Sequence, residues 1–151
     1  MVLGRDADRL APLVVAGPCA DSRARIVRNP RPDLGRSSSV RVGLEALTSP
    51  AEVLLFAAVD QPLSLPLVEA LIGAAEKAWR GAATPTAILI PTFEGRRGHP
   101  ILFHGTLLPE LLAIGEAGLG LREVPWTSDE ILLDLNTPDD AARAGAAIPP
   151  T

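Results

Sequence analysis

Two short segments of the chain carry residue types that can do chemistry together. In the first, Asp60 ends the most apolar run of the sequence, residues 53–59, and is followed at once by Gln61 and Pro62. A carboxylate at the end of a buried strand can reach a ligand beyond the carboxyl edge of an α/β sheet. There it can hold Mg²⁺ together with substrate phosphates. The alternative, that Asp60 only caps a turn between strand and helix, stays open.

The second segment is the loop Gly95–Pro100, in which two glycines bracket two arginines and precede a histidine. Glycine permits tight turning and a close approach of the backbone to a ligand. The arginines and His99 suit an anionic or heteroaromatic group, and Pro100 restricts His99 to extended geometry. The alternatives are that the arginines are solvated charges on a hairpin and that the histidine is structural, as we expect of His104.

A third candidate is the pair Asp134 and Asn136, two oxygen-bearing residues near the end of the chain. On an extended strand, residues two apart point the same way, so either could meet Asp60 across a crevice and share a cation. The alternative is a helix start with Thr137 as its cap, and we assign the acidic residues 139–140 to that helix start because the helix dipole favours them.

Three consecutive serines, Ser37, Ser38 and Ser39, precede a predicted helix. Free backbone N–H groups and hydroxyls at such a position can receive a phosphate, a ribose or a base edge. Arg36 and Arg41 add positive charge. Helix capping explains one serine, but three are more than a cap needs.

Composition limits the class of protein. The chain has 151 residues, of which 47% are hydrophobic, and a formal net charge of −4. This predicts one globular domain and argues against a nucleic-acid or membrane-surface binder, which would be basic. The single Cys19 excludes a disulfide framework within the chain and fits a reducing compartment. Because no apolar run is long enough to cross a bilayer and no signal peptide opens the sequence, we expect a cytoplasmic protein.

Apolar runs of strand length alternate with helical patterns, which predicts an α/β domain with a mostly parallel sheet to position these residues. Ser64 is expected to cap the helix that follows Asp60, with Pro66 in its first turn. The expected strands are 1–3, 25–27, 53–59, 87–90, 101–103, 123–126 and 131–135, and the expected helices are 6–14, 39–47, 65–79, 107–114 and 137–144.

Four segments in this order, Arg36–Leu44, Val59–Leu63, Gly95–Phe103 and Leu133–Asp140, resemble the molybdenum cofactor cytidylyltransferases and their relatives in the MobA-like nucleotidyltransferase family. The resemblance covers residues 29–144. It implies a three-layer Rossmann-like nucleotidyltransferase fold that transfers a nucleotide from CTP to the phosphate of the molybdopterin cofactor and releases pyrophosphate. It also implies Mg²⁺ as the cofactor and a molybdoenzyme or maturation chaperone as a further partner.

The resemblance also implies a role for each candidate. Asp60 would be catalytic and would hold Mg²⁺ together with Asp134 or Asn136. Ser37, Ser38, Ser39 and Arg41 would contact the nucleotide. The residues facing the pterin would be Gln61, Pro62, Gly98, His99 and Pro100. The alternatives are a sibling enzyme that uses GTP or a sugar phosphate, a non-catalytic module that binds the pterin cofactor, and one half of a split enzyme.

One family feature has no match in the chain. Family members open with a central strand and a glycine-rich loop that cradles the triphosphate, and Gly4-Arg5 is no substitute because no second glycine, serine or lysine follows. We therefore expect residues 1–151 to be a single MobA-like domain that is N-terminally truncated and lacks the first strand. The chain alone should release negligible pyrophosphate from CTP.

A missing central strand would leave two sheet edges unpaired. The isolated chain should therefore be poorly soluble, self-associate or need a partner. A cooperative thermal unfolding transition of a monomer would contradict this.

Overall fold

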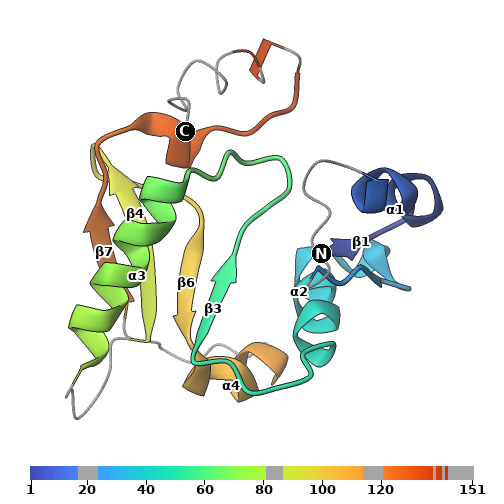
Figure 1. Cartoon of the computed structure of the whole chain (residues 1–151), viewed down its shortest axis with the longest axis horizontal. Coiled ribbons are helices and arrows are strands. Elements are labelled where there is room, and N and C mark those ends of the chain that lie inside the picture. Colours follow the sequence, from blue (N-terminus) through green and yellow to red (C-terminus); the bar gives the residue numbers. More distant parts are fainter. Residues whose placement is uncertain (17–23, 81–86, 114–120, 138, 141, 143–151) are drawn as a thin grey trace. The chain divides into compact units, whose positions relative to one another are not determined.

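The computed structural model describes residues 1–16, 24–80, 87–113, 121–137, 139–140 and 142 (Figure 1). The chain forms two compact units, Met1–Pro50 with Leu108–Glu116, and Ala51–Leu107 with Ala117–Thr151. None of the helices in the described part of the chain has the length and apolar character needed to cross a membrane.

The first unit is built on a short parallel pair of strands. β1 (Val2–Leu3) pairs with β2 (Val27–Arg28), and helix α1 (Ala7–Ala16) follows β1. A 3₁₀ turn, η1 (Pro32–Leu34), leads into helix α2 (Arg36–Glu45), which packs against β1 and against helix α4 (Leu108–Ala113).

The second unit holds the main sheet. Its strands are β3 (Val53–Phe56), β4 (Ile88–Phe93), β5 (Arg96–Arg97), β6 (Ile101–His104) and β7 (Leu121–Pro125). β6 lies antiparallel between β3 and β4, β5 forms a hairpin with β4, and β7 pairs with β4 in parallel. β3, β4 and β7 therefore run in one direction. The predicted α/β class is confirmed, but the inserted β6 makes the sheet mixed.

Helix α3 (Leu65–Trp79) crosses one face of this sheet (Figure 1). Leu67, Leu71 and Ala75 recur every four residues, so they share one face of the helix. They form the buried core together with Leu89, Leu102 and Ile131. The predicted start of the helix is confirmed, because the Ser64 hydroxyl accepts a hydrogen bond from the backbone N–H of Leu67 at 3.4 Å and Pro66 occupies the first turn.

Gly73 lies inside α3 with open space around the position of a Cβ atom. Glycine costs backbone entropy in a helix interior, so Gly73→Ala should stabilise the protein by about 0.5–1 kcal/mol. Thermal unfolding should show a higher midpoint temperature. An unchanged or lower midpoint would mean that a neighbouring atom lies close to Gly73, which contradicts the open space described around it.

One predicted strand is too long, and one predicted strand is wrong. The strand 53–59 ends at Phe56, because β6 offers only four partners, from His104 opposite Val53 to Ile101 opposite Phe56. The strand 131–135 is instead the 3₁₀ helix η3 (Asp129–Leu132), which begins after Ser128 with that side chain accepting from the Glu130 N–H, and irregular backbone follows it. The other expected strands and helices that fall on described residues are present with shifted ends.

Candidate active site

Asp60 lies in a turn after β3. The backbone N–H of Gln61 donates to the Ala58 carbonyl at 3.2 Å, which closes a turn with Asp60 in its third position. Val59, also in the turn, is 85% exposed. The expectation of a buried strand that finishes on Asp60 is therefore wrong, because the chain leaves the sheet before it reaches this residue. The Asp60 carbonyl accepts from the Leu135 N–H at 2.6 Å, which ties the turn to the segment after η3.

The predicted glycine-bracketed loop is a β-hairpin followed by a close contact. Glu94 and Gly95 have φ values of 50° and 76°, as a two-residue hairpin turn with type I′ geometry requires. Both hairpin arginines are exposed, and the Arg97 Nε lies 2.8 Å from the Glu123 carboxylate. The surroundings of the two arginines therefore agree with the alternative interpretation, in which they are solvated charges on a hairpin.

The backbone after the hairpin runs close to η3. The Gly98 N–H donates to the Pro91 carbonyl at 2.9 Å, and the His99 N–H donates to the Ile131 carbonyl at 3.0 Å. A Cβ atom on Gly98 would overlap the carbonyl oxygen of Ile131 and lie 2.7 Å from its Cβ. Only glycine permits so close an approach. The contact between Gly98 and Ile131 therefore also sets the position of His99.

Gln61 joins His99 and Asp134, so that three of the predicted residues form one cluster. Its amide nitrogen Nε2 lies 3.0 Å from Oδ1 of Asp134 and 3.2 Å from Nδ1 of His99. Its amide oxygen is buried and has no hydrogen-bond partner among the described residues. The cluster therefore draws on three segments that lie far apart in the sequence. Around it, Pro62, Gly98 and Pro100 are buried, and the His99–Pro100 peptide bond is cis.

The candidate metal ligands come from two segments held together by the Leu135–Asp60 backbone bond. Asp60 is half-buried, whereas Asp134 and Asn136 are exposed. The Asn136 N–H donates to the Asp134 carbonyl at 3.1 Å, so this stretch is tightly turned, and the expected placement of both residues on one face of a strand is wrong.

The donor chemistry fits Mg²⁺. Within the described ranges, no group of three His, Cys, Asp or Glu residues could hold a metal ion by itself. Asp60 with either Asp134 or Asn136 would supply two oxygen ligands, and Mg²⁺ usually completes its shell with water and substrate phosphates.

The predicted helix start after this segment is confirmed for the residues that can be described. The Thr137 hydroxyl accepts from the Asp140 N–H at 3.2 Å, and the Asp140 carboxylate accepts from the Thr137 N–H at 2.9 Å. This reciprocal pair has the form of a capping box. Most of the predicted helix beyond Asp140 lies outside the described residues.

The three serines belong to the first unit and lie within helix α2. The helix begins at Arg36, and Gly35, with φ of 85°, is its N-cap without a side-chain hydrogen bond. The expectation that a serine caps this helix is therefore wrong, because Gly35 adopts a conformation that a serine rarely takes.

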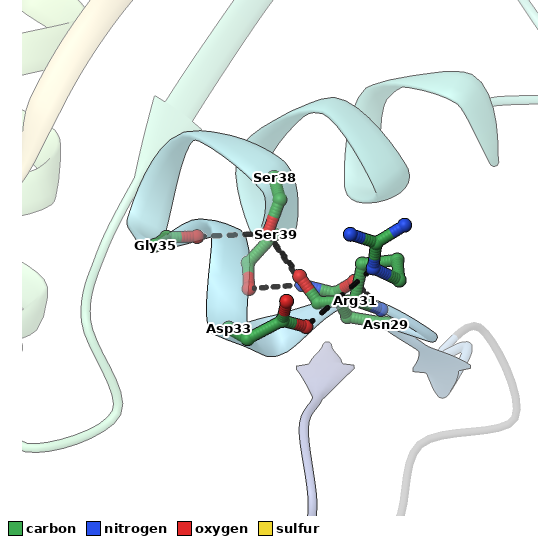
Figure 2. A network of polar contacts seen from close by, with 6 residues as sticks. All are labelled: Asn29, Arg31, Asp33, Gly35, Ser38 and Ser39. Carbon is green, nitrogen blue, oxygen red and sulfur yellow. Dashed lines mark hydrogen bonds and ion pairs between the residues drawn. The ribbon is translucent and has the colours of Figure 1, made fainter.

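Ser38 and Ser39 anchor the start of α2 to the segment before it (Figure 2). Asn29, which is 2% exposed, donates from Nδ2 to both hydroxyl oxygens, at 2.8 Å for Ser38 and 2.9 Å for Ser39. The Ser38 hydroxyl lies 2.8 Å from the Gly35 carbonyl and 3.0 Å from the Arg31 carbonyl, to which it can donate. Ser37 and Arg41 are exposed.

Sequence reasoning missed one buried carboxylate, Glu130, which is 4% exposed. Its Oε1 accepts from Trp126 Nε1 at 2.7 Å and from the Ser64 hydroxyl at 3.2 Å. The bond to Ser64 fastens η3 to the start of α3, and the bond to Trp126 fastens it to the segment after β7. The spacing of Trp126 and Glu130 within a short polar segment was the available signal, but nothing local points to Ser64.

Replacing Glu130 with alanine should destabilise the protein by about 1–3 kcal/mol, because the partly buried indole N–H of Trp126 and the buried Ser64 hydroxyl would lose their acceptor. The control is Glu123→Ala, which removes the exposed ion pair with Arg97 and should cost about 1 kcal/mol or less. Urea unfolding of both variants measures the difference. Equal losses would contradict the structural role of Glu130.

Comparison with known proteins identifies the family. The model of the MobA-like NTP transferase domain matches residues 2–126. The chain belongs to this family. It is a family of nucleotidyltransferases, which use nucleoside triphosphates and typically depend on a metal. A comparison with curated protein sequences finds no match.

Solved structures share the fold. Rv0371C of Mycobacterium tuberculosis H37Rv, crystallised in complex with manganese, is 24% identical with a TM-score of 0.64, covering 95% of this chain and 75% of that one. The 4-diphosphocytidyl-2C-methyl-D-erythritol synthase of Anaerococcus prevotii DSM 20548 is 16% identical with a TM-score of 0.68, covering 97% and 78%. Molybdopterin-guanine dinucleotide biosynthesis protein A of Archaeoglobus fulgidus is 20% identical with a TM-score of 0.55, covering 97% and 77%.

Proposed function

We propose that this MobA-like domain serves the Mg²⁺-dependent transfer of a cytidylyl group from CTP to the phosphate of a molybdopterin-type cofactor, in the cytoplasm. The observation that carries the proposal is the cluster in which Gln61 contacts both His99 and Asp134 next to the Asp60 turn. The cluster joins an amide, an imidazole and a carboxylate next to the Asp60 turn, which supports a site that positions both an acceptor and a cation. A nucleotidyl transfer requires such an arrangement, because both the acceptor and the phosphates must be positioned.

The reaction needs no protein nucleophile. An oxygen of the acceptor phosphate forms a bond to the α-phosphorus of CTP while the bond to the β-phosphate oxygen breaks, and pyrophosphate leaves. Mg²⁺ supplies charge neutralisation at the phosphates when it is bound. Asp60, with Asp134 or Asn136, is the proposed ligand set, and the Leu135–Asp60 backbone bond keeps the two segments together.

The remaining residues orient the substrates. His99 contacts the pterin, Gln61 lies on the same side and holds the His99 ring, and the buried Pro62, Gly98 and Pro100 hold the backbone around them in shape. In the first unit, taken by itself, the exposed Ser37 and Arg41 are the side chains proposed to contact the nucleotide. Ser38 and Ser39 keep the first turn of α2 in place through Asn29.

The activity is tested with the protein as the cell makes it, by following pyrophosphate release from CTP or GTP with and without molybdopterin. We expect release only with CTP, molybdopterin and Mg²⁺ together. A preference for GTP would replace this proposal by the sibling enzyme. Binding of molybdopterin without Mg²⁺ dependence, unchanged in Asp60→Ala, would replace it by a non-catalytic binding module.

The product of this reaction must reach an enzyme that uses it, so a molybdoenzyme or its maturation chaperone is the proposed protein partner. Co-purification of the protein with such a partner from its own cells would support this assignment.

A further inference from the structure

The orientation of the Gln61 amide is fixed by Asp134. An ionised carboxylate can only accept hydrogen bonds. The Gln61 atom that lies 3.0 Å from Asp134 Oδ1 must therefore be the nitrogen, because the amide oxygen would be repelled at this distance. The amide keeps this orientation although its oxygen is buried without a partner among the described residues, which is a costly arrangement. The contacts of the nitrogen therefore decide the orientation.

The same nitrogen determines the proton position on His99. Gln61 Nε2 lies 3.2 Å from His99 Nδ1, and an amide nitrogen is a donor only. His99 Nδ1 must therefore accept, which in a neutral imidazole leaves the proton on Nε2. Asp134 thus fixes the orientation of the Gln61 amide, and the amide in turn fixes the tautomer of His99.

We propose that Gln61 is a positioning residue that holds His99 as its Nε2–H tautomer, so that His99 binds an oxygen of the ligand as a hydrogen-bond donor. The ligand oxygen is of the phosphate or carbonyl class, since both accept from an N–H. His99 is then a binding donor and takes no proton at Nε2 in this state. The contact to the ligand rests on the proposed function, whereas the tautomer follows from the contacts of Gln61 with Asp134 and His99 alone.

The backbone supports this assignment. The His99 N–H is held by the Ile131 carbonyl at 3.0 Å, so the ring is attached to a main chain fixed against η3. His99 is half-buried, and its partner Gln61 lies 38 residues earlier in the sequence. A ring constrained in this way keeps one tautomer, because exchanging the proton would set two donors against each other.

The chain offers a matched internal control. It contains only two histidines, and the second, His104, has its Nδ1 3.3 Å from the Thr106 N–H, which donates to it. Two-dimensional ¹⁵N–¹H correlation spectra of the imidazole rings distinguish the tautomers of neutral histidine. The two rings are assigned with the single variant His104→Gln. Wild-type protein should show both rings as Nε2–H.

Two nearly isosteric replacements test the role of Gln61. Gln61→Glu places a second carboxylate beside Asp134 and opposite Nδ1, which favours the doubly protonated ring, so Nδ1 of His99 should carry a proton. Gln61→Met removes the donor and should give a mixture of tautomers. The His104 signals should stay unchanged in both, which also reports that the fold is retained. An Nδ1–H tautomer of His99 in the wild type, or a His99 tautomer unaffected by both replacements, would overturn the proposal.

Molybdopterin binding separates the two parts of the inference. In Gln61→Met, the affinity for molybdopterin should fall by about tenfold, the equivalent of one hydrogen bond. A changed tautomer with unchanged affinity would overturn the donor role of His99. If wild-type protein shows the expected tautomer but does not bind molybdopterin, the proposed function and the ligand contact both fail while the positioning by Gln61 stands.

Discussion

In an enzyme that carries the family's glycine-rich loop together with this chain, replacing Asp60 with asparagine should lower Mg²⁺-dependent pyrophosphate release about a hundredfold to a thousandfold, the usual loss when one preorganised electrostatic contact to a transition state is removed. Asparagine keeps the size of the side chain and an oxygen donor but removes the negative charge that Mg²⁺ favours. The structure of the turn should survive, because its bonds to Gln61 and Leu135 come from the backbone. The measurement is the initial rate with CTP and molybdopterin over a range of Mg²⁺ concentrations.

The control is Asp139→Asn, which removes an exposed carboxylate from the helix start after the same segment. It should change the rate by less than about twofold, since surface charges away from a site contribute little. If Asp60→Asn retains the wild-type rate, or if both variants lose activity equally, Asp60 is not the residue that holds the cation.

Gly98→Ala should destabilise the protein by about 1–3 kcal/mol or more, the usual range for overpacking a filled site. The added methyl group would overlap the Ile131 carbonyl oxygen, which is also the acceptor for the His99 N–H. Relief of this overlap requires η3 to move away from the loop. The variant should therefore lose both stability and molybdopterin affinity, as measured by urea unfolding and by binding titration.

Gly95→Ala is the matched control in the same hairpin. Its Cβ atom would meet nothing within 4 Å, so only the strain of a positive φ remains, about 1 kcal/mol. Molybdopterin affinity should be unchanged in this variant. Wild-type stability of Gly98→Ala would show that η3 does not pack against the loop as described.

The elements that local signals define could be predicted from the sequence. Ser64 and Pro66 mark the start of α3, and its apolar residues recur at helical spacing, so the helix follows from adjacent residues alone. The four ordered motifs likewise indicated the family, which the domain match confirms.

The errors arise where a distant contact outweighs the local pattern. The apolar run Ile131–Leu133 is typical of a strand, but the buried carboxylate of Glu130 binds Trp126 and Ser64 and fixes a 3₁₀ turn instead. The extent of β3 depends on the four residues that β6 offers as partners. Neither constraint is visible within the segment itself.

The candidate site shows the same difference between what local signals predict and what distant contacts decide. Residue types and chain order singled out Gln61, His99 and Asp134, but their mutual contacts depend on the turn at Asp60 and on the missing side chain of Gly98. Two of the three serines proved to bind Asn29, a long-range partner that helix-capping rules do not include.

The central claim, that a cation binds beside the Gln61 cluster, is tested most directly with Mn²⁺ as a paramagnetic substitute for Mg²⁺. His99 is linked to Asp134 through the side-chain amide of Gln61. His104 lies opposite Val53 at the start of β3, about 10 Å along β6 from Ile101, which follows the His99–Pro100 segment. Substoichiometric Mn²⁺ should broaden the ring signals of His99 well before those of His104, and excess Mg²⁺ or Asp60→Asn should abolish the effect. Equal broadening of both rings, or none at His99, would contradict the account.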